Sequence, residues 1–203
     1  MIRAVIFDSD GMLVHGPRFS EKYVADHDVA ITLLTPFFAG PFQQCIIGKA
    51  DLRDELQKGW LEKWSWKGSA DDLLNYWFSV GDVRDDAVFA VVPELRRKSI
   101  TCCVATNQEK YRTAYLSSTF GYGTTFDKVY ASAYIGAKKP EQGFFEYVAN
   151  DLARAHGVSD PSEVMFWDDD LDNVRGAGDY GFNAQHFTDA ASFTRVLSEA
   201  GIL

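Results

Sequence analysis

The chain opens on a short apolar run that ends abruptly in two carboxylates. Residues 2–7 are apolar except for Arg3, and Asp8 and Asp10 follow one residue apart, ahead of Gly11. A run of this length, rich in Val and Ile, predicts a strand buried on both faces of a parallel sheet. Ligands of open α/β sheets bind beyond the carboxyl ends of such strands, so Asp8 and Asp10 lie where a site is expected.

From about residue 86 onward, strand-like and helix-like segments alternate. The later strands are expected at 100–105, 128–132, 164–167 and 182–187. The helices that separate or precede them are expected at 88–98, 109–120, 141–156 and 171–180. Strands that alternate with helices in this way predict right-handed βαβ crossovers and a mainly parallel sheet flanked by helices.

A segment of different character, about residues 15–86, separates the first strand from this series. It has helical spacing over 21–34, 49–64 and 69–78, no clear strand, and four of the five tryptophans. Ser69, followed by acidic residues, is typical of a helix N-cap. We therefore predict an α/β core at 1–14 and 87–203, with an α-helical cap inserted at 15–86.

Composition narrows the class of protein. A chain of 203 residues with 46% hydrophobic side chains suits one α/β domain carrying a small insertion. The formal net charge of -9 argues against nucleic acid or an anionic membrane as partner, although a locally positive site could still bind an anionic substrate. Cys45, Cys102 and Cys103 form no metal-ligand pattern. Cys102 and Cys103 lie inside an apolar run and are expected to be buried thiols rather than a disulfide.

The chain has no apolar run approaching the roughly 18 residues of a membrane helix. Arg3 and Asp8 interrupt the first apolar stretch, so we expect no signal peptide. A cytoplasmic protein is the simplest interpretation, and composition leaves its oligomeric state open.

Polar groups follow each of the next three predicted strands. They are Thr106 and Asn107, then Lys138-Lys139-Pro140 after a short loop, and then residues 168–170, which are three aspartates. The carboxyl ends of parallel strands share one edge of a sheet, so these groups are expected to converge with the first carboxylates.

Such a grouping suits phosphoryl transfer. Two carboxylates about 4 Å apart repel by roughly 4 kcal/mol at an effective dielectric constant near 20. A hard divalent cation such as Mg²⁺ relieves that repulsion. One aspartate can then attack phosphorus while the other moves protons. A threonine hydroxyl and a lysine would stabilise the phosphoryl oxygens.

Four short motifs in this order resemble those of the haloacid dehalogenase (HAD) superfamily. They are Asp8-Ser9-Asp10-Gly11, Val104-Ala105-Thr106-Asn107, Lys139-Pro140, and Phe166-Trp167-Asp168-Asp169 with the downstream Asn173. The match extends over nearly the whole predicted core. The resemblance implies a Rossmann-like core and a helical cap inserted after the first motif.

The resemblance also implies a role for each matching residue. Asp8 would be the nucleophile that forms an aspartyl-phosphate. Asp10 would be the general acid and base. Thr106 and Asn107 would bind the phosphoryl group, and Lys139 would hold both Asp8 and the phosphate oxygens.

The implied metal site contains Mg²⁺. Its ligands would be Asp8, Asp169 and Asp10, the last through its backbone carbonyl. Asp168 and Asn173 would order the water shell around the ion. The implied substrate is a small phosphorylated metabolite.

Asp10 decides between branches of the superfamily. The dehalogenases lack an aspartate at this position because a halide leaves without a proton, whereas an alcohol needs one. Asp10 therefore favours a Mg²⁺-dependent phosphatase that cleaves a phosphate monoester. A phosphomutase of the β-phosphoglucomutase type remains an alternative, as does a non-catalytic binding or regulatory protein of the same fold.

Plainer interpretations of single residues also stand. Thr106-Asn107 could cap the following helix, and Asp170 is more typical of a helix cap than of a metal ligand. The aromatic residues of the insertion, among them Trp60, Trp64 and Trp77, are more typical of a core than of a substrate wall.

Overall fold

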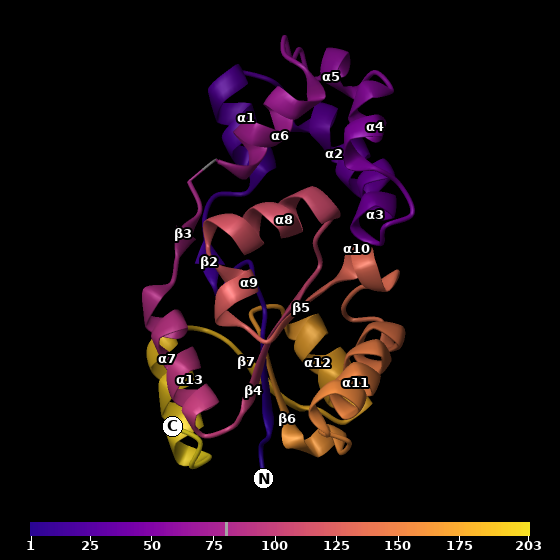
Figure 1. Ribbon diagram of the computed structural model, residues 1–203. Coiled ribbons are helices and arrows are strands. Elements are labelled where there is room, and N and C mark those ends of the chain that lie inside the picture. Colours follow the sequence, from indigo (N-terminus) through magenta and orange to yellow (C-terminus); the bar gives the residue numbers. More distant parts are fainter. Residues whose placement is uncertain (80) are drawn as a thin grey trace.

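A five-stranded parallel sheet forms the centre of the protein (Figure 1). The computed structural model describes residues 1–79 and 81–203. The strand order is β5-β4-β1-β6-β7, with bounds β1 Ala4–Phe7, β4 Thr101–Thr106, β5 Lys128–Ala131, β6 Val164–Asp168 and β7 Asn183–His186. The mainly parallel sheet predicted from the alternating pattern is confirmed.

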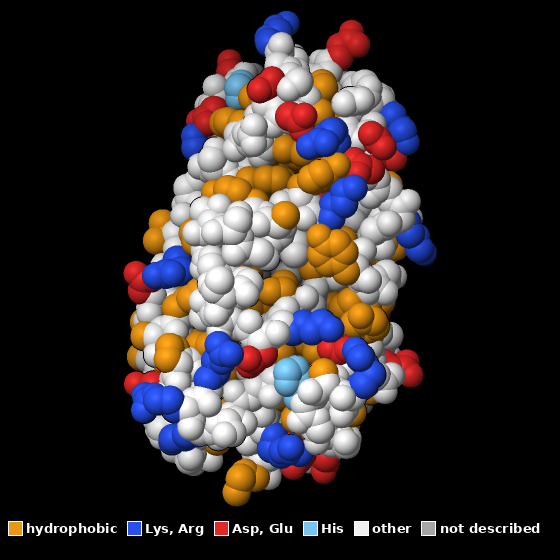
Figure 2. All heavy atoms as spheres, in the orientation of Figure 1, with side chains coloured by type: hydrophobic (Ala, Val, Ile, Leu, Met, Phe, Trp, Pro, Cys, Tyr) orange, Lys and Arg blue, Asp and Glu red, His pale blue; other side chains and the backbone are white. Residues whose placement is uncertain are grey.

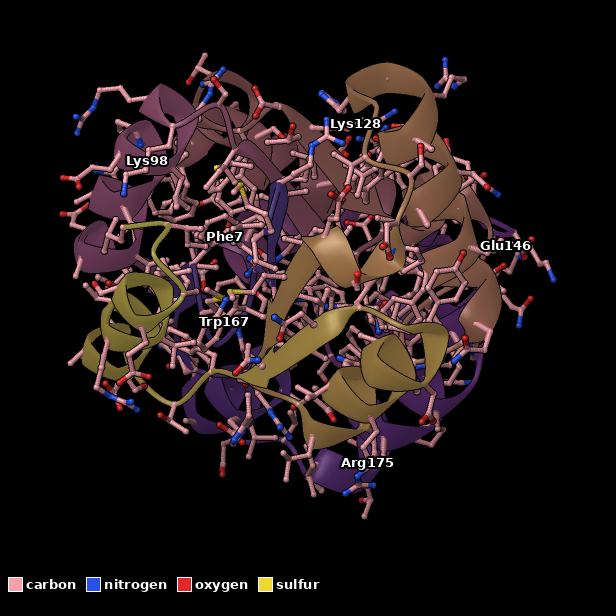
Figure 3. All side chains as sticks on the ribbon, turned by 90° about the horizontal axis from the view of Figure 1, so that it is seen from below. Phe7, Lys98, Lys128, Glu146, Trp167 and Arg175 are labelled. Atoms are coloured by element: carbon pink, nitrogen blue, oxygen red, sulfur yellow. The ribbon has the colours of Figure 1, made fainter. Side chains whose placement is uncertain are left out.

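Helices cover both faces of the sheet. α7 (Asp86–Arg97) and α13 (Ala190–Glu199) pack on one face, and α11 (Gln142–His156) and α12 (Leu171–Tyr180) on the other. Side chains of successive strand residues point to opposite faces, so β1 contributes Val5 and Phe7 to one layer and its other two residues to the other. In Figure 3, Phe7 and Trp167, which are paired in register on β1 and β6, lie near the centre of the molecule.

The edge of the sheet at the carboxyl ends of its strands is covered by short helices. α8 (Lys110–Thr119) follows β4, α9 (Tyr122–Thr125) precedes β5, and α10 (Ser132–Ile135) follows it. A 3₁₀ turn, η1 (Pro161–Glu163), precedes β6. α8 matches its predicted range, whereas α9, α10 and α13 were not expected.

In the described part of the chain, the insert that follows β1 contains six helices, which lie above α8 in Figure 1. They are α1 Phe19–His27, α2 Ile31–Ala39, α3 Pro41–Ile46, α4 Leu52–Gln57, α5 Trp60–Lys63 and α6 Ala70–Phe78. α6 begins as predicted, because Ser69 and Asp72 form a reciprocal capping box. The prediction of two longer helices in the insert is wrong. The segment 21–34 is interrupted at Asp28, where φ is +51°, and 49–64 is interrupted at Gly59, where φ is +95°.

The expectation that the insertion holds no strand is also wrong. β2 (Val14–His15) pairs antiparallel with β3 (Val83–Arg84). The two strands carry the chain out of the core and back into it. Strands of two residues are too short to show an alternating pattern, which is why the sequence gives no sign of them.

The insert has its own hydrophobic core, built around Tyr23, Phe37 and Trp64. Trp64 is fully buried and donates a hydrogen bond from its indole to the carbonyl of Leu33 (3.0 Å). Among the helices of the described residues, none combines the length and apolar content needed to cross a bilayer.

Candidate active site

A buried lysine joins two of the predicted site aspartates. The ammonium of Lys139 donates hydrogen bonds to Asp8 Oδ1 (2.7 Å), to Asp168 Oδ2 (2.6 Å) and to the carbonyl of Ala105 (2.8 Å). Its side chain is 1% exposed. β1 and β6 are neighbours in the sheet, so the residues at their carboxyl ends lie side by side, and the loop after α10 brings Lys139 between them.

Three carboxylates meet at this point. One oxygen from each of Asp8, Asp168 and Asp169 lies within 4.8 Å of the others. Burial raises the pKa of Asp8 to about 8, an effect to which the charge of Asp168 adds and which the ammonium of Lys139 opposes. Burial, reinforced by Asp168, also raises the pKa of Asp169. Asp8 and Asp168 are buried and Asp169 is exposed, so three carboxylates lie near one ammonium. A hard cation with oxygen ligands fits this donor set.

Lys139 remains charged despite its burial. Burial alone favours the neutral amine, but the carboxylates of Asp8 and Asp168 together outweigh it and raise the pKa of Lys139. A permanent positive charge beside Asp8 is suited to drawing an anionic phosphate toward that carboxylate.

Asn173 and the start of α12 orient Asp168. The amide of Asn173 donates to both oxygens of Asp168 (3.1 and 3.2 Å), and the backbone N–H of Asp170 donates to Oδ1 (2.9 Å). Asp170 itself caps α12 through the N–H of Asp172, as its position predicted. The carboxylate of Asp168 thus accepts several hydrogen bonds from the protein, which suits a residue that orients other groups of the site rather than one that binds a metal directly.

Gly11 makes room for Asp169. A Cβ on residue 11 would lie 2.2 Å from Asp169 Oδ2, and the φ of +88° at this position disfavours any other residue. The left-handed backbone and the nearby Asp169 carboxylate together favour glycine at this position of the first motif.

Thr106 and Asn107 lie at the carboxyl end of β4, on the same edge of the sheet as Asp8. Thr106 is buried at the end of β4. The Asn107 side chain accepts from the N–H of Lys139 and donates to its carbonyl, both at 2.9 Å. The Asn107 amide therefore holds the Lys139 loop. The alternative that Thr106-Asn107 caps the next helix is wrong, because Glu109 caps α8.

The Asp10 carboxylate faces α8 and is not part of the three-carboxylate cluster. It accepts hydrogen bonds from the amide of Gln108 and from the guanidinium of Arg112 (3.1 Å to Oδ1). Sequence reasoning missed both residues. The signal that points to them is their position, because Gln108 directly follows the second motif and Arg112 lies in the first turn of α8. Because the Asp10 carboxylate is turned toward α8, only its backbone carbonyl remains for a contact with a metal.

A cavity of about 360 Å³ opens between the insert and this edge of the sheet. At one end it is lined by residues of the site, Asp10, Gly11 and Asn107, together with Gln108 and Arg112. The opposite wall consists of aromatic side chains from four helices of the insert, namely Phe19, Phe38, Phe42, Trp77 and Phe78. Trp60 and Trp64 belong to the core of the insert as expected, whereas Trp77 and Phe78 both pack in that core and line the cavity.

The sequence pattern of haloacid dehalogenase-like hydrolases matches residues 2–181. This chain is a haloacid dehalogenase-like hydrolase. Solved structures of similar proteins agree on the fold of this hydrolase. A HAD family enzyme of Bacteroides thetaiotaomicron, in complex with magnesium and inorganic phosphate, is 21% identical with a TM-score of 0.72 over 93% of this chain and 95% of that one. A HAD-like family hydrolase of Porphyromonas gingivalis is 22% identical with a TM-score of 0.77 over 97% and 98%.

Two curated fungal proteins match parts of this HAD-like hydrolase. The sesquiterpene phosphatase astK of Aspergillus oryzae is 28% identical over 113 residues, which cover 55% of this chain and 55% of the phosphatase. The drimenol cyclase drtB of Aspergillus calidoustus is 42% identical over 65 residues, which cover 32% of this chain and 11% of the cyclase. The chain thus matches about half of one relative and about a tenth of the other.

Proposed function

We propose that the protein is a Mg²⁺-dependent phosphatase that hydrolyses a phosphate monoester of a small metabolite through an aspartyl-phosphate at Asp8. The observation that carries this proposal is the contact of the Lys139 ammonium with both Asp8 and Asp168, beside Asp169. A nucleophilic carboxylate, a fixed cation and a set of metal-ligating oxygens would then lie together at one edge of the sheet. The phosphatase relative and the magnesium and phosphate bound to a neighbour of the same fold support the same chemistry.

The metal would be held by Asp8, Asp169 and the backbone carbonyl of Asp10, with Asp168 and Asn173 behind them. Bound there, Mg²⁺ supplies positive charge that offsets the repulsion between a carboxylate nucleophile and an anionic phosphate. The mutually close carboxylates of Asp8, Asp168 and Asp169 fit such an ion.

The proposed reaction has two steps, the formation and the hydrolysis of an aspartyl-phosphate. In the first, Asp8 attacks phosphorus, the bond from phosphorus to the ester oxygen breaks, and Asp10 gives a proton to the departing alcohol. In the second, Asp10 takes a proton from water, the water oxygen attacks phosphorus, and inorganic phosphate leaves Asp8. Lys139, the Thr106 hydroxyl and the backbone N–H of Asn107 would hold the phosphoryl oxygens throughout.

The test is the release of inorganic phosphate from p-nitrophenyl phosphate by the purified protein, with MgCl₂ or with EDTA. We expect turnover only with Mg²⁺, and loss of turnover in Asp8→Asn. Asp160→Asn, which changes an aspartate that caps the η1 turn away from the site, is the matched control and should remain active. Mg²⁺-dependent turnover that survives in Asp8→Asn would overturn the proposal. Net release of phosphate also separates hydrolysis from phosphoryl transfer to a second hydroxyl.

A further inference from the structure

We infer that the substrate is the phosphate ester of an apolar, hydrocarbon-like alcohol, held with its hydrocarbon part in the cavity beneath the insert. This inference rests on the proposed function. It adds the class of the leaving alcohol, which the four sequence motifs leave open.

The position of the cavity assigns it to the leaving group. Its lining includes Asp10, the residue proposed to protonate the departing oxygen, and does not include the nucleophile Asp8. An ester whose phosphorus lies beside Asp8 and whose bridging oxygen lies beside Asp10 would therefore direct its alcohol part into this space.

Most polar groups at the inner end of the cavity already have partners within the protein. Arg112 is paired with Asp10 and with Asp82. Gln108 donates to Asp10, and both oxygens of Glu109 accept backbone N–H groups at the start of α8. The lining also includes Arg18 and Ser20, on the side of the insert. Sugar hydroxyls buried at the inner end would lose their hydrogen bonds to water and find few replacements there, which disfavours a sugar phosphate.

The opposite wall offers aromatic surface. Trp77 lies at its centre, with ring centroids 4.3 Å from Phe19, 5.4 Å from Phe38 and 5.3 Å from Phe42. Phe78 continues the wall to the polar end, where the Arg112 guanidinium lies 6.0 Å from the ring centroid. On the face drawn in Figure 2, hydrophobic side chains form a band between the helices of the insert and the part below them. A wall of this kind gains affinity from apolar area removed from water.

The size of the cavity sets a limit on the alcohol. Its volume of about 360 Å³ is at the low end of ligand pockets, which range over roughly 300–1,000 Å³. At the roughly 30 Å³ that a water molecule occupies in the liquid, this is space for on the order of a dozen non-hydrogen atoms.

The decisive experiment measures kcat/KM with Mg²⁺ for butyl, hexyl, octyl, decyl and dodecyl phosphate, with glucose 6-phosphate and p-nitrophenyl phosphate in parallel. Burial of one methylene corresponds to a factor of roughly three to four, so kcat/KM should rise by about that factor per methylene and level off near decyl phosphate. Glucose 6-phosphate should be a poorer substrate than octyl phosphate by roughly a hundredfold or more.

The two proposals fail in different ways. If no ester, p-nitrophenyl phosphate included, is hydrolysed with Mg²⁺, the phosphatase proposal is wrong. If esters are hydrolysed but kcat/KM is flat with chain length, or glucose 6-phosphate is preferred, only the apolar-alcohol inference is wrong. The series on the unaltered protein decides this without any variant.

A pair of variants then places the effect in the cavity. Phe42 is half-buried on α3, so Phe42→Ala removes part of the wall at modest risk to folding. The ratio of kcat/KM for octyl over butyl phosphate should fall roughly tenfold. Phe120→Ala, which truncates another half-buried phenylalanine outside the cavity lining, should keep that ratio within about twofold. An equal fall in both variants would overturn the assignment of the alcohol to this cavity.

Discussion

Arg112 on α8 forms an ion pair with Asp82, with Nη2 and Oδ2 2.8 Å apart and side chains 11% and 7% exposed. Asp82 lies in the segment that returns the chain from the insert to the core, just before β3. The same guanidinium lies 3.1 Å from Asp10. Burial raises the pKa of Asp82, and the charge of Arg112 opposes the rise. One arginine therefore connects the proposed catalytic acid to the segment by which the chain returns from the insert to the core.

A double-mutant cycle measures this connection. Asp82→Ala leaves a largely buried guanidinium short of one partner, and Arg112→Met leaves a buried carboxylate without its cation. Each should lower the free energy of unfolding by about 2–4 kcal/mol. The double variant should lose less than the sum, with a coupling energy of about 1–3 kcal/mol. Urea unfolding of the four proteins gives these values, and strictly additive losses would contradict the pairing.

Asp10→Asn tests whether Asp10 supplies the proton that the leaving alcohol needs. The amide keeps the size of the carboxylate and an oxygen for Arg112, but it transfers no proton. Turnover of an alkyl phosphate should fall by about 10²- to 10⁴-fold, because the alkoxide leaves unprotonated. Nitrophenolate leaves without a proton, so p-nitrophenyl phosphate should give a rapid burst of product and then slow turnover as the aspartyl-phosphate accumulates. Rapid-quench kinetics report both phases. Equal losses on the two substrates without a burst would contradict the assigned role.

Gly176 on α12 should be essential to the position of Lys139. A Cβ at residue 176 would lie 2.7 Å from the carbonyl oxygen of Pro140 and 2.8 Å from its Cβ. Gly176→Ala must therefore displace the residue that follows Lys139. We expect a loss of about 1–3 kcal/mol in the free energy of unfolding and a lower kcat.

Gly178→Ala, two residues further along the same helix, is the control. Its Cβ would meet only Ala184 Cβ at 3.9 Å, which is an ordinary contact. Because alanine favours helix more than glycine does, this variant should gain up to about 1 kcal/mol and keep its activity. Thermal unfolding and phosphate release distinguish the two, and equal behaviour of the two variants would show that the Pro140 contact is unimportant.

The sheet and the meeting of Asp8, Lys139 and Asp168 could be predicted because their signals are strong and local. A buried parallel strand needs an unbroken apolar run, and the residue after it must lie at the carboxyl edge. These requirements bring residues that are more than a hundred positions apart into contact, whatever the loops between them do.

Other features depend on tertiary contacts that have no local pattern. A left-handed backbone is uncommon for a residue other than glycine, so the sequence does not predict one at Asp28. The sequence therefore predicts one helix where the structure has two. The sequence predicts that Asn107 binds phosphate. The hydrogen bonds of its side chain with the backbone of Lys139 depend on the positions of two loops that are distant in sequence. The ion pair of Arg112 with Asp82 depends in the same way on how the insert returns to the core.

Asp51 should give the contact between insert and core a dependence on pH. It caps α4 through the N–H groups of Arg53 and Asp54, and it accepts hydrogen bonds from Lys110 and from Tyr111 Oη (2.9 Å to Oδ2) on α8. Burial raises the pKa of Asp51, but these hydrogen bonds lower it by more, to about 2.

Since the pKa of Asp51 in the folded protein lies below its value of about 3.9 in the unfolded chain, its contribution to stability is complete above about pH 5 and is lost as pH falls toward 2. Asp51→Asn keeps a capping side chain but carries no charge. It should be less stable than the unaltered protein by about 1 kcal/mol at pH 7, and roughly half of that gap should remain at pH 3. Urea unfolding at the two pH values measures both gaps. A gap that widens on acidification would require a raised pKa, and therefore a carboxylate that the ammonium of Lys110 does not stabilise.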